Sequence, residues 1–303
     1  MELIKSIKEV DRPFGVTIGN FDGVHLGHRA MLGEIKEDCK NLGLELVVIT
    51  FNPHPIQILR PRENFLINSY DERRQLIEDE GVQYFLEINF TRDFSTLGPE
   101  EFLNDYIQSE NLKKIFLGYD FAFGANKQGD AGFVEKYSKD RNLDFKILDE
   151  FVASEKGVSS SKVREQLKSG NVEVARKLLG RDFYVSGRIV KGEGRGKIIG
   201  FPTANISYDE ARIIPQRGVY ATRTIYRDQT YFSVTNVGLN PTFCERDSLS
   251  VETHLLDFEN DIYGEFIKVE FVKRIRDEKK FSSVNELVGQ IKKDAVESRK
   301  ILS

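Results

Sequence analysis

Residues 19–29, GNFDGVHLGHR, decide how the N-terminal half of the chain folds. They follow a short apolar run, residues 16–18, and precede an amphipathic stretch that begins near Arg29. This order predicts a strand, a glycine-rich turn and then the N-terminus of a helix. A helix N-terminus carries unpaired backbone N–H groups and the positive end of the helix dipole, so it favours phosphate oxygens.

Two of the chain's four histidines, His25 and His28, lie in this stretch with the spacing HxGH. Gly19, Gly23 and Gly27 allow the backbone to approach a ligand closely. We interpret the pair as two imidazoles that face one polyphosphate and donate hydrogen bonds to charge that develops in a transition state. The alternative is an exposed turn that happens to contain histidines, but the order of strand, glycines and helix favours phosphate chemistry.

The composition narrows the class of protein. A length of 303 residues predicts two domains, and 40% hydrophobic with 30% charged residues is typical of a soluble globular protein. The net charge is −4 and no basic stripe is present, which argues against nucleic acid as a partner. Cys39 and Cys244 lie far apart without a CxxC motif, so neither a disulfide framework nor a structural zinc site is expected.

The chain contains no apolar segment of the length that a signal peptide or a membrane span requires. We therefore expect a cytoplasmic protein without a membrane partner. The sequence is compatible with an oligomer.

Up to about Gly180, short apolar runs alternate with helical periods, which predicts a parallel α/β sheet. The runs expected to form strands are residues 15–18, 44–51, 84–88, 114–117 and 145–148. Ser69 with Glu72 forms a candidate capping box, and Pro99 suits a first helical turn. In such sheets ligands bind beyond the carboxyl ends of the strands.

The segments that follow these strands are unusual, and we expect them to converge on one pocket. Residues 50–55, TFNPHP, offer the polar groups of Asn52 and His54. Residues 118–130, GYDFAFGANKQGD, offer Asp120. Each has an ordinary reading when taken alone, such as a turn aspartate beside core aromatic residues.

A serine run follows the fifth expected strand. Ser159 and Ser160 precede a short helical stretch that carries Arg164 one turn further on. Alone, the serines would be an N-cap. Together with the guanidinium, the hydroxyls and the helix N–H groups form a phosphate clamp.

After Gly180 the periodicity changes to that of strands, which predicts a small antiparallel barrel closed by a helix. The expected strands are residues 184–190, 219–226, 231–237, 251–257 and 266–273. The closing helix is expected to carry one apolar stripe, consisting of Val284, Leu287, Val288, Ile291 and Ala295. Gly170 and Gly180 are expected to end two short helices before the barrel.

Chemistry in this half concentrates in residues 191–206, KGEGRGKIIGFPTANI, where four glycines suit a loop that folds over a nucleotide. Neither a P-loop nor a GxGxxG motif is present. Thr203 and Asn205 are two residues apart, so they point to one side of an extended segment and either share Mg²⁺ or phosphate or are ordinary solvated residues. Glu252, within an otherwise apolar strand, is either an edge residue that faces water or a general base.

These motifs resemble a known family. HxGH, NPHP at residues 52–55, GxDFxFG at residues 118–124 and SSSxxR at residues 159–164 are similar to the adenylyltransferase module of the bacterial bifunctional riboflavin kinase and FAD synthetase family, within the HxGH nucleotidyltransferase superfamily. The second half resembles that family's riboflavin kinase module through LLGRDF, GFPTAN, NVGLNPTF, VETHLLDF and RDEKKF. The resemblance covers nearly the whole chain.

The resemblance implies an α/β architecture with two modules. An N-terminal parallel-sheet FMN adenylyltransferase domain, residues 1–180, precedes a riboflavin kinase domain, residues 181–303, which is a small antiparallel β-barrel with a C-terminal helix. It implies that riboflavin is phosphorylated by ATP to FMN. It also implies that the FMN phosphate attacks the α-phosphorus of a second ATP to give FAD and pyrophosphate, with Mg²⁺ as the cofactor.

The resemblance also assigns roles to individual residues. Glu252 takes the proton from the ribityl hydroxyl, while His25 and His28 act on the triphosphate in the first domain. Contacts with ATP or phosphate are implied for Gly19, Phe21, Ser159, Ser160, Arg164, Gly192, Lys197 and Gly200. Flavin contacts are implied for Asn52, Asp120 and Arg276, and a metal role for Thr203 and Asn205.

Two rival hypotheses remain. In the first, only one module works and the other serves as a scaffold, although the motifs of both are intact. In the second, the chain is a flavin- or nucleotide-binding regulator without turnover, for which a carboxylate such as Glu252 beside a hydroxyl has no use.

Overall fold

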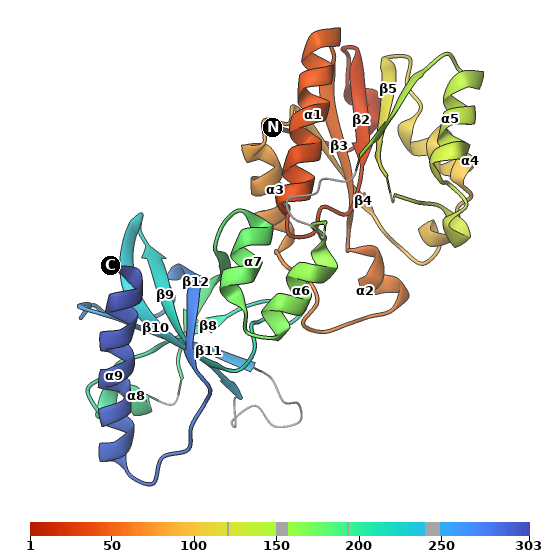
Figure 1. The fold of residues 1–303 in the computed structure, drawn as a ribbon. Helices are drawn as coiled ribbons and strands as arrows, with labels where there is room; N and C mark the ends of the chain where they lie inside the picture. Colours follow the sequence, from red (N-terminus) through yellow and green to blue (C-terminus); the bar gives the residue numbers. More distant parts are fainter. Residues whose placement is uncertain (120, 150–156, 193, 240–248) are drawn as a thin grey trace. The chain divides into compact units, whose positions relative to one another are not determined.

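The computed structural model describes residues 1–119, 121–149, 157–192, 194–239 and 249–303, and Figure 1 shows their ribbon. The chain divides into two compact units. The first consists of Met1–Arg62 and Asn68–Ser159, and the second of Glu63–Ile67 and Ser160–Ser303. The first contains a parallel sheet and the second a closed antiparallel barrel, which confirms the expected fold class.

The sheet of the first unit has six strands in the order β1-β4-β3-β2-β5-β6, and every neighbouring pair is parallel. The strands are β1 Glu2–Ile4, β2 Phe14–Ile18, β3 Glu45–Asn52, β4 Tyr84–Asn89, β5 Leu112–Gly118 and β6 Asp144–Leu148. The expected strands therefore exist, and the short β1 was not expected. Consecutive residues of β3 are fully buried, because helices cover both faces of the sheet.

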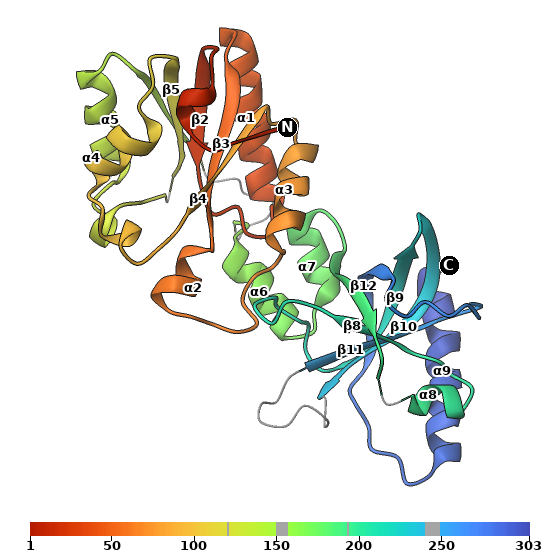
Figure 2. The same ribbon diagram turned by 180° about the vertical axis from the view of Figure 1, so that it is seen from behind.

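The helices of the first unit are α1 Leu26–Leu42, α2 Pro55–Leu59, α3 Tyr70–Asp79, α4 Pro99–Phe102 and α5 Ala131–Asp140. Short turns of other helical types lie at η1 Ile7–Glu9, η2 Phe94–Thr96, η3 Leu103–Ile107 and η4 Ala125–Lys127. Helices α1 and α3 pack on one face of the sheet, and α4 and α5 on the other (Figure 2). The predicted capping box of α3 and the proline in the first turn of α4 are both confirmed.

The topology of this sheet contains one switch point. Strand β2 lies between β3 and β5, and the chain reaches β3 directly but reaches β5 only after forming β4. The connections that leave the carboxyl ends of β2 and β5 therefore run to opposite faces, and ligands of open α/β sheets bind at such a point. The HxGH loop begins at the end of β2, beside this switch point.

The second unit begins with two helices, α6 Ser160–Lys168 and α7 Val172–Leu179. Its strands form a closed barrel in the order β10-β11-β8-β7-β12-β9. Their bounds are β7 Phe183–Val190, β8 Ala204–Ser207, β9 Gly218–Tyr226, β10 Gln229–Leu239, β11 Leu249–Leu255 and β12 Phe266–Arg276, with the short α8 Arg195–Ile198 before β8. Gly170 and Gly180 adopt left-handed backbone conformations after the two helices, as predicted.

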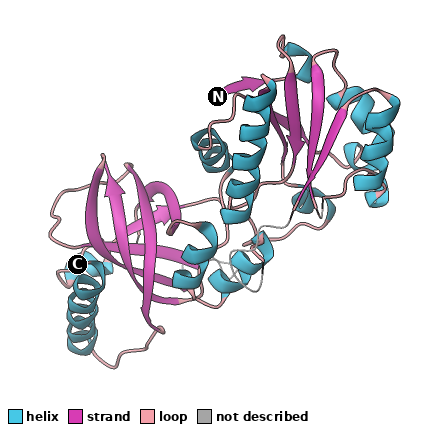
Figure 3. Cartoon of the chain, turned by 45° about the horizontal axis from the view of Figure 1, so that its top comes forward, coloured by secondary structure: helices cyan, strands magenta, loops and turns pink. Residues whose placement is uncertain are grey.

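The C-terminal helix α9, Val284–Leu302, lies along the barrel (Figure 3). The predicted stripe is partly wrong, because Val284 is 60% exposed while the buried residues of the helix include Asp294 and Ser298. Ala295 does pack on an apolar cluster of the barrel. The helix is also held by polar bonds, including one from Ser298 Oγ to the backbone oxygen of Ser233 at 2.8 Å. An apolar periodicity cannot reveal such a polar face.

Candidate active sites

His25 occupies the N-cap position of α1, and the HxGH spacing sets its contact with His28. The Nδ1 atom of His25 accepts a hydrogen bond from the backbone N–H of His28 at 3.3 Å. In the neutral tautomer that accepts this bond, the ring proton lies on Nε2. The two rings are stacked, with centroids 3.7 Å apart and planes 13° from parallel. The predicted pairing of the two imidazoles is thus present in the fold.

The loop before α1 is shaped by its small and buried residues. A Cβ atom on Gly19 would lie 2.9 Å from the ring of Phe21, and one on Gly27 would lie 3.2 Å from the ring of His25. Phe21 has a φ of 49° and is buried, and its ring meets the His28 ring edge-on at 5.3 Å. These contacts explain why positions 19 and 27 hold glycines, and they place the edge-on ring of Phe21 beside the imidazole of His28.

The loop after β3 is anchored to α3. Asn52 is half-buried at the end of β3 and pairs in register with Asn89 of β4. The backbone N–H of His54 donates to the hydroxyl of Tyr70 at 2.8 Å, and its Nδ1 accepts from the N–H of Ile56 at 3.1 Å. His54 therefore has a clear local role as the N-cap of α2.

The serine run lies at the division of the chain. Ser159 is the last residue of the first unit, whereas Ser160 and Arg164 belong to the second. The Nε atom of Arg164 donates to the backbone oxygen of Phe65 at 2.8 Å, and its guanidinium lies 3.8 Å from the centroid of the Phe65 ring. Asp120 lies outside the described residues.

Glu252 is the central residue of a row that crosses three strands of the barrel. It lies opposite Asn205 of β8 on one side and opposite Asn236 of β10 on the other. The chain neighbours of Glu252, Val251 and Thr253, are buried inside the barrel, so the carboxylate points outward. Side chains directly opposite on antiparallel strands have Cβ atoms about 5 Å apart, within reach of one shared ligand.

The glycine loop lies against this row. A Cβ atom on Gly192 would be 2.3 Å from Nδ2 of Asn205, and one on Gly196 would be 3.4 Å from Oγ1 of Thr203. Gly200 has a φ of 84°, a conformation that favours glycine. The side chain of Lys197 lies outside the described part of the structure.

A cavity of about 180 Å³ opens beside Thr203 and Asn205. Its walls also include Gly192 and Gly194 from the glycine loop and the stretch of residues 258–263. The predicted metal-site residues and the predicted nucleotide loop therefore share one cavity. In the described residues, no group of three or more His, Cys, Asp or Glu side chains could hold a metal ion.

Arg276 lies at the end of β12 and forms an ion pair with α9. Its Nη2 and Nε atoms donate to the carboxylate of Asp294 at 2.6 and 3.0 Å, and its Nη1 donates to the backbone oxygen of Asp277 at 2.8 Å. Arg276 is one of the three predicted flavin residues, and in this structure its guanidinium joins the last strand to the C-terminal helix.

Sequence reasoning missed two residues that the fold places at these sites. Asn236 was quoted only as the first residue of a motif, and its position opposite Glu252 depends on how β10 and β11 pair. Arg73 was not singled out, although its buried guanidinium contacts the loop after β2 and the end of β3. Neither residue has a local sequence signal, because the partners of each lie far along the chain.

The fold and the two sites define a class of protein with a parallel α/β unit that carries an HxGH loop and a separate antiparallel barrel with its own cavity. Family models match both parts, FAD synthetase at residues 7–162 and riboflavin kinase at residues 179–302. The chain belongs to the family of bifunctional riboflavin kinase/FMN adenylyltransferases, which confirms the resemblance noted in the sequence.

Similar proteins cover almost the whole chain. The bifunctional riboflavin kinase/FMN adenylyltransferase of Bacillus subtilis is 36% identical over 98% of this chain and 95% of its own length. The Escherichia coli protein of the same name is 35% identical over 94% and 91%. A solved structure described as a macrolide-efflux protein from Streptococcus pneumoniae has a TM-score of 0.88 at 34% identity and covers 98% of each chain. Within the described residues, none of the helices has the length and apolar character needed to cross a membrane.

Proposed function

We propose that this chain phosphorylates riboflavin to FMN with ATP in the barrel, and then adenylylates FMN with a second ATP to give FAD and pyrophosphate in the N-terminal unit. The observation that carries the proposal is the coincidence of each family match with its own site. The FAD synthetase match contains the stacked HxGH pair, and the riboflavin kinase match contains the row around Glu252.

The two activities are assigned to residues 1–180 and 181–303. The family matches at residues 7–162 and 179–302 support this division by activity. The compact units divide earlier, after Ser159, because α6 and α7 belong to the unit that contains the barrel. Residues 160–180 therefore connect the two activities in sequence while packing with the second.

In the barrel, Glu252 acts as the general base. Its carboxylate takes the proton from the ribityl 5′-hydroxyl of riboflavin as that oxygen attacks the γ-phosphorus of ATP and ADP leaves. The outward direction of Glu252 and its position opposite Asn205 support this role, because base and phosphate ligand must act on neighbouring atoms. Arg276 is assigned to the flavin side of the site.

The phosphates of ATP are assigned to the cavity beside Thr203 and Asn205. The hydroxyl and amide oxygens of these residues are ligands that suit Mg²⁺, which prefers oxygen and keeps contacts with substrate phosphates. Bound Mg²⁺ supplies positive charge that neutralises the phosphates. Gly192, Lys197 and Gly200 complete the nucleotide contacts, and the close approach of Gly192 to Asn205 supports a loop that folds over the phosphates.

In the N-terminal unit, the FMN phosphate attacks the α-phosphorus of ATP. The Nε2 proton of His25 and the imidazole of His28 stabilise the departing pyrophosphate, which the N-terminus of α1 also favours. Phosphate contacts are assigned to the backbone at Gly19 and Phe21 and to Ser159, Ser160 and Arg164. Asn52 and Asp120 are assigned to the flavin.

The cytoplasm is the compartment that suits this activity, because both steps consume ATP. Cys39, the cysteine among the described residues, is a free and buried thiol, in agreement with a reducing environment.

A single incubation tests the proposal. The purified chain is mixed with riboflavin, ATP and Mg²⁺, and the flavins are separated by chromatography. Formation of FAD supports both activities. FMN alone limits activity to the barrel and calls for a direct assay with FMN, whereas bound flavin without conversion favours a regulator and overturns the proposal.

A further inference from the structure

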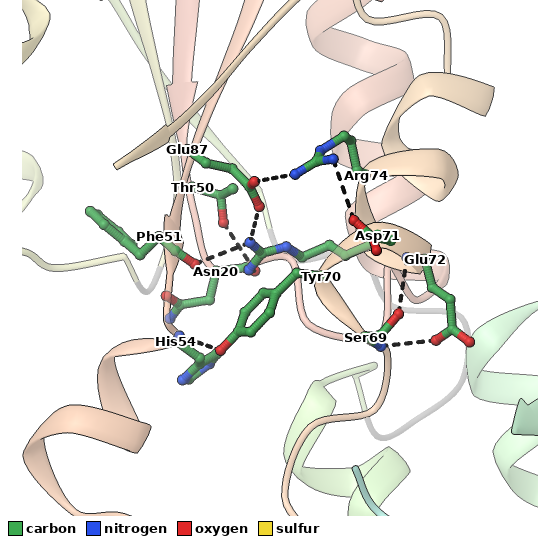
Figure 4. A network of polar contacts seen from close by, with 11 residues as sticks. Asn20, Thr50, Phe51, His54, Ser69, Tyr70, Asp71, Glu72, Arg74 and Glu87 are labelled. Atoms are coloured by element: carbon green, nitrogen blue, oxygen red, sulfur yellow. Dashed lines mark hydrogen bonds and ion pairs between the residues drawn. The ribbon is translucent and has the colours of Figure 1, made fainter. Parts of the chain in front are cut away.

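Arg73 lies in the first turn of α3 and is only 3% exposed. A buried guanidinium requires partners, because an unpaired buried charge is strongly unfavourable. Its Nη1 donates to the backbone oxygen of Asn20 at 3.1 Å, and its Nη2 donates to the backbone oxygen of Phe51 at 3.0 Å. Its Nη2 also donates to Oε1 of Glu87 on β4 at 2.8 Å. Figure 4 labels the three residues that accept these bonds, Asn20, Phe51 and Glu87.

The two backbone oxygens belong to the segments that carry the candidate site. Asn20 lies between Gly19 and Phe21, in the loop that leads from β2 to His25. Phe51 immediately precedes Asn52 at the end of β3. The planar guanidinium has a fixed fork of donors, so it sets the separation of these two backbone segments.

The turn that carries Arg73 is itself held firmly. The backbone N–H of Ser69 donates to the Glu72 carboxylate at 2.9 Å, and the N–H of Glu72 donates back to Ser69 Oγ at 3.2 Å. Tyr70 lies three residues before Arg73, on the same face of the helix, and its hydroxyl accepts from the N–H of His54. One helical turn therefore holds the loop after β2 and the loop after β3 together.

We propose that Arg73 is a positioning residue for adenylyl transfer, which holds the loop before His25 and the end of β3 in the geometry that the reaction needs. The inference rests on the proposed function of this unit. It assigns Arg73 no contact with substrate, since the side chain is buried and its Nη1 and Nη2 atoms bond two backbone oxygens and Glu87. This role identifies the side chain that holds the loop of the HxGH site in place.

The test compares three variants of the full chain. Arg73→Gln removes the charged fork, and Arg73→Lys keeps the charge with a single nitrogen. Arg74→Gln is the matched control, because Arg74 also bonds Glu87, at 2.6 Å, while its other hydrogen bond goes to Asp71 of the same helix. Each variant is assayed separately for FAD formation from supplied FMN and for FMN formation from riboflavin.

We expect Arg73→Gln to lower kcat for FAD formation by about 10- to 100-fold, since a misplacement of about 1 Å can cost about 100-fold. Arg73→Lys should lose less, and Arg74→Gln should stay within about twofold of the unaltered chain. FMN formation should stay within about twofold in all three. A folded Arg73→Gln variant with unchanged kcat for FAD formation would overturn the proposal.

Hydrogen exchange of the backbone amides separates positioning from general stability. In Arg73→Lys, peptides that cover residues 19–28 and 51–56 should exchange faster, while those from β5 should be unchanged. Equally faster exchange throughout the sheet would mean that Arg73 merely stabilises the unit, and would overturn its positioning role. If the unaltered chain forms no FAD, the proposed function fails, while this exchange pattern still decides whether Arg73 holds the two loops.

Discussion

Glu252 of β11 and Asn205 of β8 lie directly opposite one another in the barrel, on its outer face. Their positions in the sequence are far apart, and antiparallel pairing alone brings them together. The backbone of Gly192 lies against the side chain of Asn205, so the glycine loop, the amide and the carboxylate form one continuous surface. This surface is where the kinase predictions can be tested.

Replacing Glu252 by glutamine should remove the general base while keeping the shape of the side chain. We expect kinase turnover to fall by about 100- to 10,000-fold, which is the usual contribution of a positioned base. FAD formation from supplied FMN should be nearly unchanged, because that reaction belongs to the other unit. The two reactions are measured separately by chromatography. Glu265→Gln is the control, because Glu265 of the same unit bonds Arg227 at 3.0 Å and has no assigned role in the site. A loss of less than tenfold would exclude Glu252 as the base.

Gly192→Ala should lower kinase activity for a steric reason. The added Cβ would lie 2.3 Å from Nδ2 of Asn205, so either the loop or the amide must move. We expect a rise of about tenfold in the KM for ATP, equal to about 1.4 kcal/mol of lost binding. Gly289→Ala is the matched control, since a Cβ there meets nothing within 4 Å. Equal KM values for both variants would show that the loop does not bind ATP.

His28→Ala should give the mirror image of the Glu252 variant. Removing one of the two stacked imidazoles leaves the departing pyrophosphate with fewer hydrogen-bond donors, so FAD formation should fall by about 100-fold or more. FMN formation should be spared. Equal damage to both reactions would indicate misfolding, and thermal unfolding of the variant would reveal it.

Asp294→Asn tests the ion pair between the barrel and α9. The Asp294 side chain is 4% exposed and holds Arg276, so loss of its charge should destabilise the chain by about 3 kcal/mol. Asp257→Asn is the control, because that carboxylate also pairs with an arginine, Arg299 of α9, but is 74% exposed. The control should cost much less, because water and salt screen an exposed ion pair. Urea unfolding measures the loss of stability in both variants. Equal losses would contradict a special role for the buried ion pair.

Cys39 should make stability depend on alkaline pH. Burial raises the pKa of the Cys39 thiol from 9.0 to about 11. Below pH 9 the thiol is protonated in both the folded and the unfolded chain, so its contribution to the free energy of unfolding is fully present. Between about pH 9 and 11 the unfolded chain loses this proton while the folded chain keeps it, so stability falls as pH rises. Thermal unfolding across this range should show a shallower decline in Cys39→Ala, and identical slopes would contradict the raised pKa.

Much of the fold follows from local patterns. The apolar runs predicted most of the strands, because a parallel strand covered on both faces has to be apolar. The Ser69–Glu72 capping box and the glycine after α7 were also confirmed. Both could be predicted because helix ends are determined by residues close in sequence. Strand β8 was expected only as an extended segment, because four residues are too few to show a period.

The sequence by itself determined the two-unit organisation, the strand-turn-helix order around His25 and His28, and the family to which the chain belongs. Only the tertiary structure decided that Asn236 and Asn205 flank Glu252, that Arg73 joins the loop after β2 to the end of β3, and that Arg276 pairs with Asp294. The physical reason is that these contacts join residues far apart in the sequence. A period-two pattern determines which face a side chain takes, whereas strand order and barrel closure determine which distant residue lies beside it.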